Sequence, residues 1–357
     1  MRHESGTRRD FLRTVGWATT VATIGSVVRG GAAAAAGKLV FVGWGGTYQD
    51  SQREAYLKPF MKETGIDIEE IKEGPRVSKL KAQVQSGVVE WDVVDFETSD
   101  MLRAAADGLL EPIDTKVVNT ADVIPRAVYP YGVGSVSAST VLAYSTKKYP
   151  VGKPRPTSWQ DFWDVKKFPG PRGLQDFVKT NLEFALLADG VPKEKLYPLD
   201  VERAFRSLDR IKPNVSVWWS KGAQPIQLLS DGEVDLCSAY NGRIYAARKE
   251  GSPVDLEWNG GALDFQFWCV PKGSKNKELA MKFIAFAIQP KAEAEATKYI
   301  TYGPTNTKSW EYVDKTAAAN LPTAPANLAK QVVLDNKWWL DNEAKLTERW
   351  EAWKLKK

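Results

Sequence analysis

Few side chains in this sequence could carry out catalysis, and this scarcity limits the function. His3 is the only histidine among 357 residues, and it lies in a stretch with the features of a removable signal. Without it the protein has no imidazole for acid–base catalysis, for a Ser-His or Cys-His nucleophile, or for a metal site. A carboxylate pair of the glycosidase type stays open, since 44 acidic residues could supply one. We therefore expect a binding protein with no catalytic residue, metal or cofactor, and keep a hydrolase as the alternative.

The only two cysteines lie in apolar, strand-like runs. Cys237 belongs to EVDLCSAY and Cys269 to FQFWCVP. Such positions favour buried free thiols. A disulfide stays open as the alternative, because sequence does not give the required geometry.

A glycine-containing turn, GWGGTY at residues 43–48, follows the first apolar run. It has neither the spacing nor the lysine of a phosphate-binding P-loop. Two glycines between a strand and a helix could present backbone N–H groups to an anionic or carbonyl group. Equally, Gly45 and Gly46 could be needed only for their backbone dihedral angles. Both interpretations stay open.

Residues 1–36 have the features of an export signal: a basic start, an apolar run and the small-residue tract GGAAAAAG. The motif TRRDFLRT, with Arg8 and Arg9 paired, resembles a twin-arginine signal. We expect cleavage among Ala32 to Ala36 and a periplasmic product. No later run has the roughly 20 apolar residues needed for a membrane anchor.

The basic charge is concentrated in this same segment. The formal net charge is +5, and five arginines against Glu4 and Asp10 put +3 of it in residues 1–36. The remainder is close to neutral, so we do not expect a nucleic-acid partner.

The elements that must position any site alternate between strand and helix, which predicts an α/β protein with an open, mostly parallel sheet. At about 150 residues per domain, the length suggests two domains. The expected strands are 38–43, 66–71, 92–96, 233–240 and 265–271, and the expected helices are 48–64, 79–87, 204–211, 225–232, 244–251 and 278–288.

Several ordered fragments then resemble a known family. They are FVGWGGTY, EWDVVDF, GLLEPID, TSWQDFWD, DGEVDLCSAYNGR, VPKGSKNKELAMKFIAFAIQP and YGPTN. The chain resembles the periplasmic solute-binding proteins of ABC importers, specifically the spermidine/putrescine-binding branch. The resemblance implies a type II periplasmic binding protein fold with no catalytic machinery, whose two lobes are joined by crossing strands and close on a ligand in the cleft.

The resemblance also implies the domain boundaries and the partners. After the signal (1–36), lobe 1 comprises 37–133 and 262–310, and lobe 2 comprises 134–261 and 311–357. The expected partners are a small amine or amino acid and an inner-membrane ABC permease, with the receptor a monomer. A ligand-presenting sensor for a chemoreceptor is an alternative with the same fold.

By resemblance, aromatic residues form the walls of the pocket. Trp44 follows the first strand, with Tyr48 a few residues later. Tyr240 precedes the Asn-Gly of YNGR, Tyr302 lies near a Pro-Thr pair, and Trp339 lies in the C-terminal segment. Aromatic faces suit a methylene chain that carries cations.

The carboxylates that bind amines in the family are not retained. Phe177 and Thr180 occupy two of those positions, and Gln266 occupies a third. Asp264 appears two residues earlier, and Arg243 replaces a serine. A slip of a few residues in this alignment by eye would bring Asp176 or Glu183 into the pocket instead.

These changes favour a zwitterionic ligand such as γ-aminobutyrate. Arg243 would bind a carboxylate, and Asp264, or alternatively Glu97, would bind an ammonium group. A polyamine ligand, with Arg243 as an ordinary surface residue, stays the alternative. The expected ligand-binding residues are Trp44, Tyr48, Glu97, Phe177, Tyr240, Arg243, Asp264, Gln266, Tyr302 and Trp339.

Overall fold

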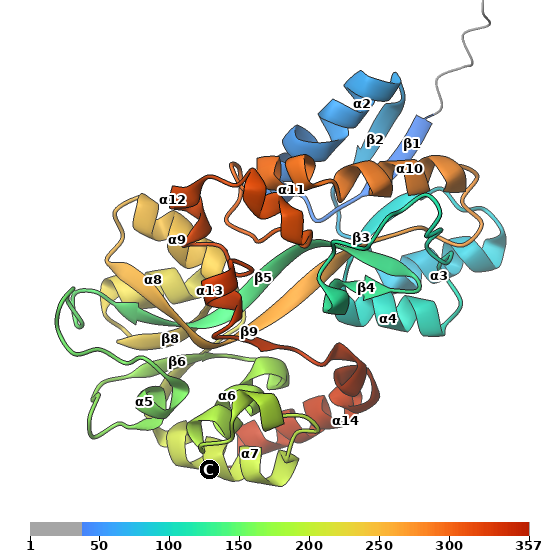
Figure 1. Cartoon of the computed structure of the whole chain (residues 1–357). Helices are drawn as coiled ribbons and strands as arrows, with labels where there is room; N and C mark the ends of the chain where they lie inside the picture. The colour runs from blue at the N-terminus through green and yellow to red at the C-terminus, as the bar shows by residue number, and fades with distance from the viewer. Residues whose placement is uncertain (1–37, 357) are drawn as a thin grey trace, which may run out of the picture. The chain divides into compact units, whose positions relative to one another are not determined.

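The computed structural model describes residues 38–356, so the twin-arginine motif and the cleavage site lie outside the described residues (Figure 1). The strands are β1 (Lys38–Val42), β2 (Asp67–Ile71), β3 (Val93–Glu97), β4 (Val128–Tyr129), β5 (Gly132–Ser145), β6 (Arg172–Gln175), β7 (Val215–Trp219), β8 (Leu236–Tyr240), β9 (Val254–Cys269) and β10 (Val332–Val333). The helices are α1 (Gly46–Gln52), α2 (Lys58–Thr64), α3 (Val77–Ser86), α4 (Thr98–Ala106), α5 (Trp159–Trp163), α6 (Val178–Ala188), α7 (Val201–Ile211), α8 (Gln224–Asp231), α9 (Asn241–Lys249), α10 (Lys277–Ala287), α11 (Pro290–Ala296), α12 (Lys315–Ala318), α13 (Pro325–Leu328) and α14 (Asn336–Leu355).

All the strands belong to one sheet with the central order β2-β1-β3-β9-β5-β8-β6-β7. The outer groups β2-β1-β3 and β8-β6-β7 are parallel. The expectation of a mostly parallel sheet is wrong at the centre, where β9 pairs antiparallel with both β3 and β5, and β5 pairs antiparallel with β8. These two long strands run side by side between the outer groups (Figure 1). They span both groups because they are 14 and 16 residues long, well beyond an ordinary strand.

The expected helix over 48–64 begins slightly earlier and contains a short π-helical segment, Arg53–Leu57, between α1 and α2. It ends as expected at Gly65, which has the left-handed backbone (φ 72°) that glycine adopts without steric cost. At its start, Gly45 and Gly46 also have positive φ, and a Cβ on Gly45 would come within 2.8 Å of the Lys72 carbonyl oxygen. The Gly45 N–H is bonded to the Gln49 side chain. The turn therefore needs its glycines for backbone geometry.

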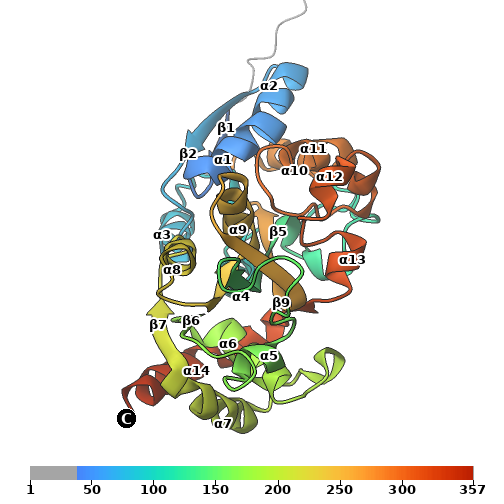
Figure 2. The ribbon, with the colours of Figure 1, turned by 90° about the vertical axis from the view of Figure 1, so that its left-hand side faces the viewer.

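Several apolar clusters hold the helices on the sheet. One contains Phe41, Phe96 and Phe267 from the β1, β3 and β9 strands. Another joins α6, α7 and α14, which lie together in Figure 2, and contains Trp339 and Trp350. Cys237 and Cys269 are buried free thiols, as expected.

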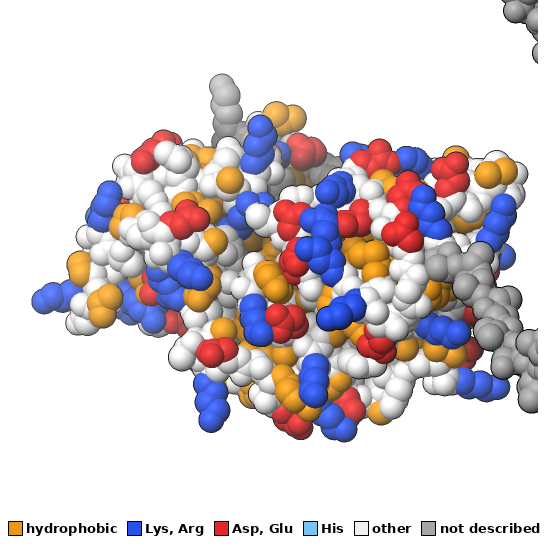
Figure 3. Space-filling model, turned by 90° about the horizontal axis from the view of Figure 1, so that it is seen from above, with side chains coloured by type: hydrophobic (Ala, Val, Ile, Leu, Met, Phe, Trp, Pro, Cys, Tyr) orange, Lys and Arg blue, Asp and Glu red, His pale blue; other side chains and the backbone are white. Residues whose placement is uncertain are grey.

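None of the helices in residues 38–356 is long and apolar enough to cross a bilayer. On the face shown in Figure 3, basic and acidic side chains are interspersed.

Candidate ligand-binding site

The strands bring the site residues together at their carboxyl ends, where ligands bind in open α/β sheets. Trp44 follows β1, Glu97 ends β3 and Tyr240 ends β8. The crossing strand β9 adds Asp264 and Gln266. These two residues point to the same face because side chains alternate along a strand.

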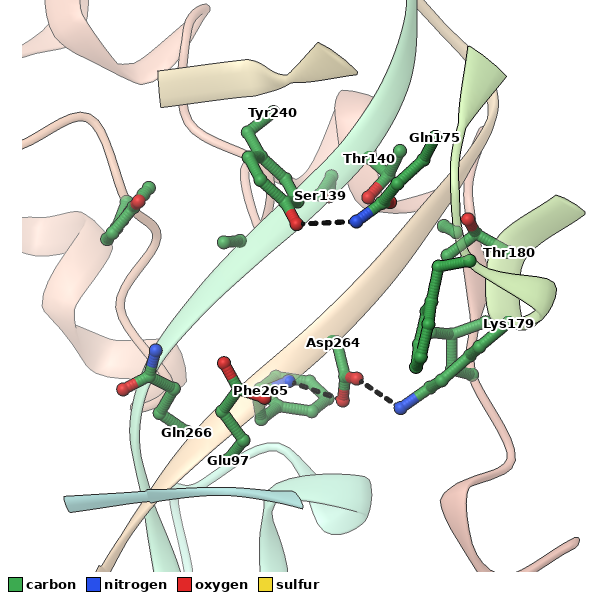
Figure 4. A pocket seen from close by; sticks show the side chains of 15 residues that line it. Glu97, Ser139, Thr140, Gln175, Lys179, Thr180, Tyr240, Asp264, Phe265 and Gln266 are labelled. Carbon is green, nitrogen blue, oxygen red and sulfur yellow. Dashed lines mark hydrogen bonds and ion pairs between the residues drawn. The ribbon is translucent and has the colours of Figure 1, made fainter. Parts of the chain in front are cut away.

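Two adjoining cavities contain all but one of the expected site residues. The Asp264 cavity, of about 280 Å³, is lined by Phe177, Tyr240 and Asp264 (Figure 4). The Arg243 cavity, of about 690 Å³, is lined by Trp44, Tyr48 and Arg243. Glu97, Gln266 and Tyr302 line both cavities. The two cavities therefore form one continuous candidate site.

Trp339 is the expected residue that lines neither cavity. Its side chain is fully buried beneath α6, and its indole N–H donates to Glu183 Oε1 at 2.7 Å. Glu183 is also fully buried, and burial raises its pKa. This pair belongs to the packing of α14 on α6.

Asp95 holds the aromatic wall of the Arg243 cavity in position. Its Oδ2 accepts the Tyr48 hydroxyl at 2.7 Å, and its backbone carbonyl accepts the Trp44 indole N–H at 2.8 Å. The Tyr48 ring meets Tyr302 edge-on, with centroids 5.7 Å apart. Asp95 is fully buried, which raises its pKa to about 6, although hydrogen bonds from Tyr48, Ser135 and Gln52 oppose this shift.

Arg243 lies in the first turn of α9, whose start is fixed by Asn241. The Asn241 amide accepts from Ser139 N and donates to the Thr301 carbonyl. Gly242 packs so closely on Tyr302 that a Cβ there would come within 2.7 Å of the ring. The Arg243 side chain is exposed to the cavity and, within residues 38–356, forms no ion pair. Its guanidinium is free to bind an anion.

Glu97 is the second charged residue that lines the Arg243 cavity and has no ion-pair partner among the described residues. Its side chain is exposed and lines both cavities. Desolvation by the surrounding protein and the nearby negative charge of Asp264 raise the pKa of Glu97 to about 7. Tyr240 and Tyr302 lie close to both of these charged side chains. The negative charge of Glu97 raises the pKa of each tyrosine, and the positive charge of Arg243 lowers it.

Asp264, in contrast, is already engaged. Its Oδ2 accepts from Lys179 Nζ at 2.9 Å, and its Oδ1 accepts from Thr98 and Asn336, both at 2.8 Å. The Phe265 N–H also donates to Oδ1.

Sequence reasoning missed Lys179 and the polar side chains around it. Lys179 lies between Phe177 and Thr180, the two positions where the family would have carboxylates, and this position was the available signal. Gln175, which donates to the Tyr240 hydroxyl at 2.8 Å, was also missed. The buried Gln266 Oε1 and Thr180 Oγ1 have no hydrogen-bond partner among the described residues, although both side chains line the Asp264 cavity.

A cleft lined by aromatic rings, with free charges of both signs and no cluster of metal ligands among residues 38–356, is suited to binding a small polar solute. A model of the bacterial extracellular solute-binding protein family matches residues 55–323. This chain belongs to that family. The match confirms the predicted family and the role of a solute-binding receptor.

The chain is 41% identical to a γ-aminobutyric acid-binding protein of Pseudomonas aeruginosa, covering 88% of this chain and 90% of that protein. Among solved structures, an ABC transporter substrate-binding protein from Bradyrhizobium japonicum USDA 110 is 44% identical, with a TM-score of 0.82 and coverage of 89% and 99%. A structure described as the Atu4243-GABA receptor is 40% identical, with a TM-score of 0.81 and coverage of 90% and 98%. These matches confirm the type II periplasmic binding protein fold.

Proposed function

We propose that this receptor binds a zwitterionic ω-amino acid such as γ-aminobutyrate and delivers it to an inner-membrane ABC permease. The observation that carries the proposal is the pair of free, opposite charges, Glu97 and Arg243, on one cavity. A carboxylate binds guanidinium through two parallel hydrogen bonds, and an ammonium group binds Glu97. The resemblance to proteins named for γ-aminobutyrate supports the same ligand.

The walls between these charges suit the rest of such a ligand. Trp44, Tyr48 and Tyr302 offer aromatic faces and edges to a short methylene chain. The same rings stabilise a cation through their quadrupoles.

A polyamine is the competing ligand. It is favoured by relatives such as a spermidine/putrescine-binding periplasmic protein of Escherichia coli, 27% identical over 70% of this chain. A diamine needs anionic partners for both of its ends, and Arg243 would face one of them with a like charge. The availability of Glu97 and the engagement of Asp264 favour the zwitterion.

The proposal includes the route and form of the receptor. We propose export by the twin-arginine pathway, function in the periplasm as a monomer, and closure of lobe 1 (37–133 and 262–310) on lobe 2 (134–261 and 311–357). Replacing both Arg8 and Arg9 with lysine is expected to keep the precursor in the cytoplasm, which cell fractionation detects. Efficient export of that variant would contradict the twin-arginine route.

A thermal-shift screen tests the ligand class with four compounds of equal chain length. γ-Aminobutyrate carries both charges, n-butylamine and butyrate carry one each, and putrescine carries two positive charges. A ligand at 100 times its Kd stabilises the native state by about 2.7 kcal/mol. We expect γ-aminobutyrate to raise Tm the most. A rise in Tm with putrescine and none with γ-aminobutyrate would contradict the proposal.

A further inference from the structure

Lys179 brings a positive charge of the protein's own into the ligand cavity. Its side chain is 7% exposed, and it reaches the cavity from the first turn of α6 (Figure 4). Its Nζ donates to Asp264 Oδ2 at 2.9 Å and to Asn336 Oδ1 at 2.6 Å. Burial disfavours the charged form, but the attraction of Asp264 outweighs it, so the pKa of Lys179 lies above its ordinary value.

The backbone departs from helical geometry where it carries this lysine. Lys179 has an extended ψ of 144°, and Thr180 has φ 71°. Thr180 is the only non-glycine residue with positive φ among residues 38–356. A residue with a Cβ adopts this conformation only where the surrounding structure enforces it. Such local strain is typical of functional sites, and here it accompanies the contact of Lys179 with Asp264.

Both oxygens of Asp264 already accept hydrogen bonds from the protein, and one of these donors is the Lys179 ammonium. Three donors converge on its Oδ1, and Lys179 occupies its Oδ2. Its charge is compensated inside the protein, although the carboxylate itself lines the cavity. Glu97, on the same cavity, has no such partner.

We infer that Lys179 is a specificity-determining residue: its ammonium fills the second anionic position of the pocket and restricts the site to ligands with one ammonium group. This inference rests on the proposed function, in that Glu97 holds the ligand's ammonium. A second ammonium would have to displace Lys179 from Asp264, or lie beside it without an anionic partner, where like charges repel. Together with Arg243, the lysine thus disfavours a second ammonium group in the pocket.

The test compares two ligands that differ by one ammonium group. Calorimetry gives the affinities of putrescine and n-butylamine for the wild-type protein and for Lys179→Gln. We expect putrescine to bind the wild type no more tightly than n-butylamine. In Lys179→Gln the freed Asp264 accepts the second ammonium group. The affinity for putrescine is therefore expected to rise at least tenfold relative to the affinity for n-butylamine.

Three variants control this measurement. Lys179→Arg keeps the cation and is expected to keep the exclusion of putrescine. Lys337→Gln removes an exposed lysine next to Asn336 and is expected to leave the ratio of affinities unchanged. Adding Asp264→Asn to Lys179→Gln is expected to abolish the gain, because the second ammonium then has no carboxylate.

The outcomes separate this inference from the proposed function. Folded Lys179→Gln protein that gains no affinity for putrescine overturns the inference, whatever γ-aminobutyrate does. Failure of the wild type to bind γ-aminobutyrate overturns the proposed function. In that case, a higher affinity of Lys179→Gln for putrescine would still support the role of Lys179. The wild-type protein gives a second test that does not depend on a folded variant. If the wild type binds putrescine tenfold more tightly than n-butylamine, the inference is overturned.

Discussion

Two carboxylates face the Asp264 cavity, and they differ in what surrounds them. Asp264 lies on the crossing strand β9, where Lys179, Thr98 and Asn336 all donate to it. Glu97 lies at the end of β3, where no hydrogen bond or ion pair joins its side chain to another described residue. One negative charge is compensated within the protein, and the other is open to solvent and ligand.

The difference shows that the number of acidic residues in a pocket does not give the charge available to a ligand. A buried ion pair contributes little net stability over an apolar pair, but loss of one partner leaves the other uncompensated. On the proposed function, Asp264 therefore maintains the structure of the site, and Glu97 binds the ligand.

The largest expected effect is a difference in the free energy of unfolding between variants of the two carboxylates. Asp264→Ala leaves the Lys179 ammonium buried without a counter-charge and is expected to lower the free energy of unfolding by about 3 kcal/mol. Glu97→Ala, the matched control, removes a carboxylate that has no protein partner and whose raised pKa means that its charge is disfavoured in the folded protein, so it is expected not to lower the free energy of unfolding. Urea denaturation at pH 7.5 measures both. Equal destabilisation by the two variants would contradict the comparison.

A tenfold effect on affinity is expected from pH. The pKa of Glu97 is raised to about 7. Below pH 7 the side chain is therefore mostly protonated, and it must lose this proton before it can bind an ammonium group. The affinity for γ-aminobutyrate is therefore expected to fall about tenfold from pH 8 to pH 6, with proton release on binding. The amino and carboxyl groups of the ligand titrate outside this range. Calorimetry on wild type and Glu97→Gln checks this, and an equally steep pH dependence in Glu97→Gln would assign the titration to another group.

Sequence patterns predicted the elements that obey local rules. The apolar run ending at Gly43 and the helix ending at Gly65 were predicted because strand and capping signals are local. β5 was missed: its sequence, GVGSVSASTVLAYS, is rich in small and polar residues, and it is buried along almost its whole length without alternation. Apart from the short neighbouring strand β4, its partners β8 and β9 lie more than 90 residues away, so only the tertiary structure reveals it.

The candidate site shows the same limit. The aromatic residues and Arg243 were predicted because they stand at positions where the family has ligand-binding residues, and all but Trp339 line the two cavities. Lys179 was missed because a lysine near the start of a helix is ordinarily solvated. Its role depends on Asp264, 85 residues later, and on the backbone turn at Thr180.

The smallest expected effect extends the comparison to a third carboxylate, Glu293, which is fully buried without a cation. Burial raises its pKa to about 8 against the hydrogen bonds that it receives. The native state therefore retains a proton that the unfolded state loses, and stability falls as pH rises toward 8. Between pH 7 and pH 8 the wild type is expected to lose about 1 kcal/mol relative to Glu293→Gln, whose amide mimics the protonated acid. Parallel urea-denaturation profiles for the two proteins would contradict this assignment.

The most direct test of the account is the affinity of γ-aminobutyrate for Glu97→Gln and Asp264→Asn, measured side by side by calorimetry at pH 8. Both changes remove one negative charge from the same cavity with little change in shape. Since Glu97 is assigned to the ligand's ammonium and Asp264 to Lys179, Glu97→Gln is expected to weaken binding at least ten times more than Asp264→Asn. An equal or larger loss in Asp264→Asn would put the ammonium group on Asp264 and contradict the account.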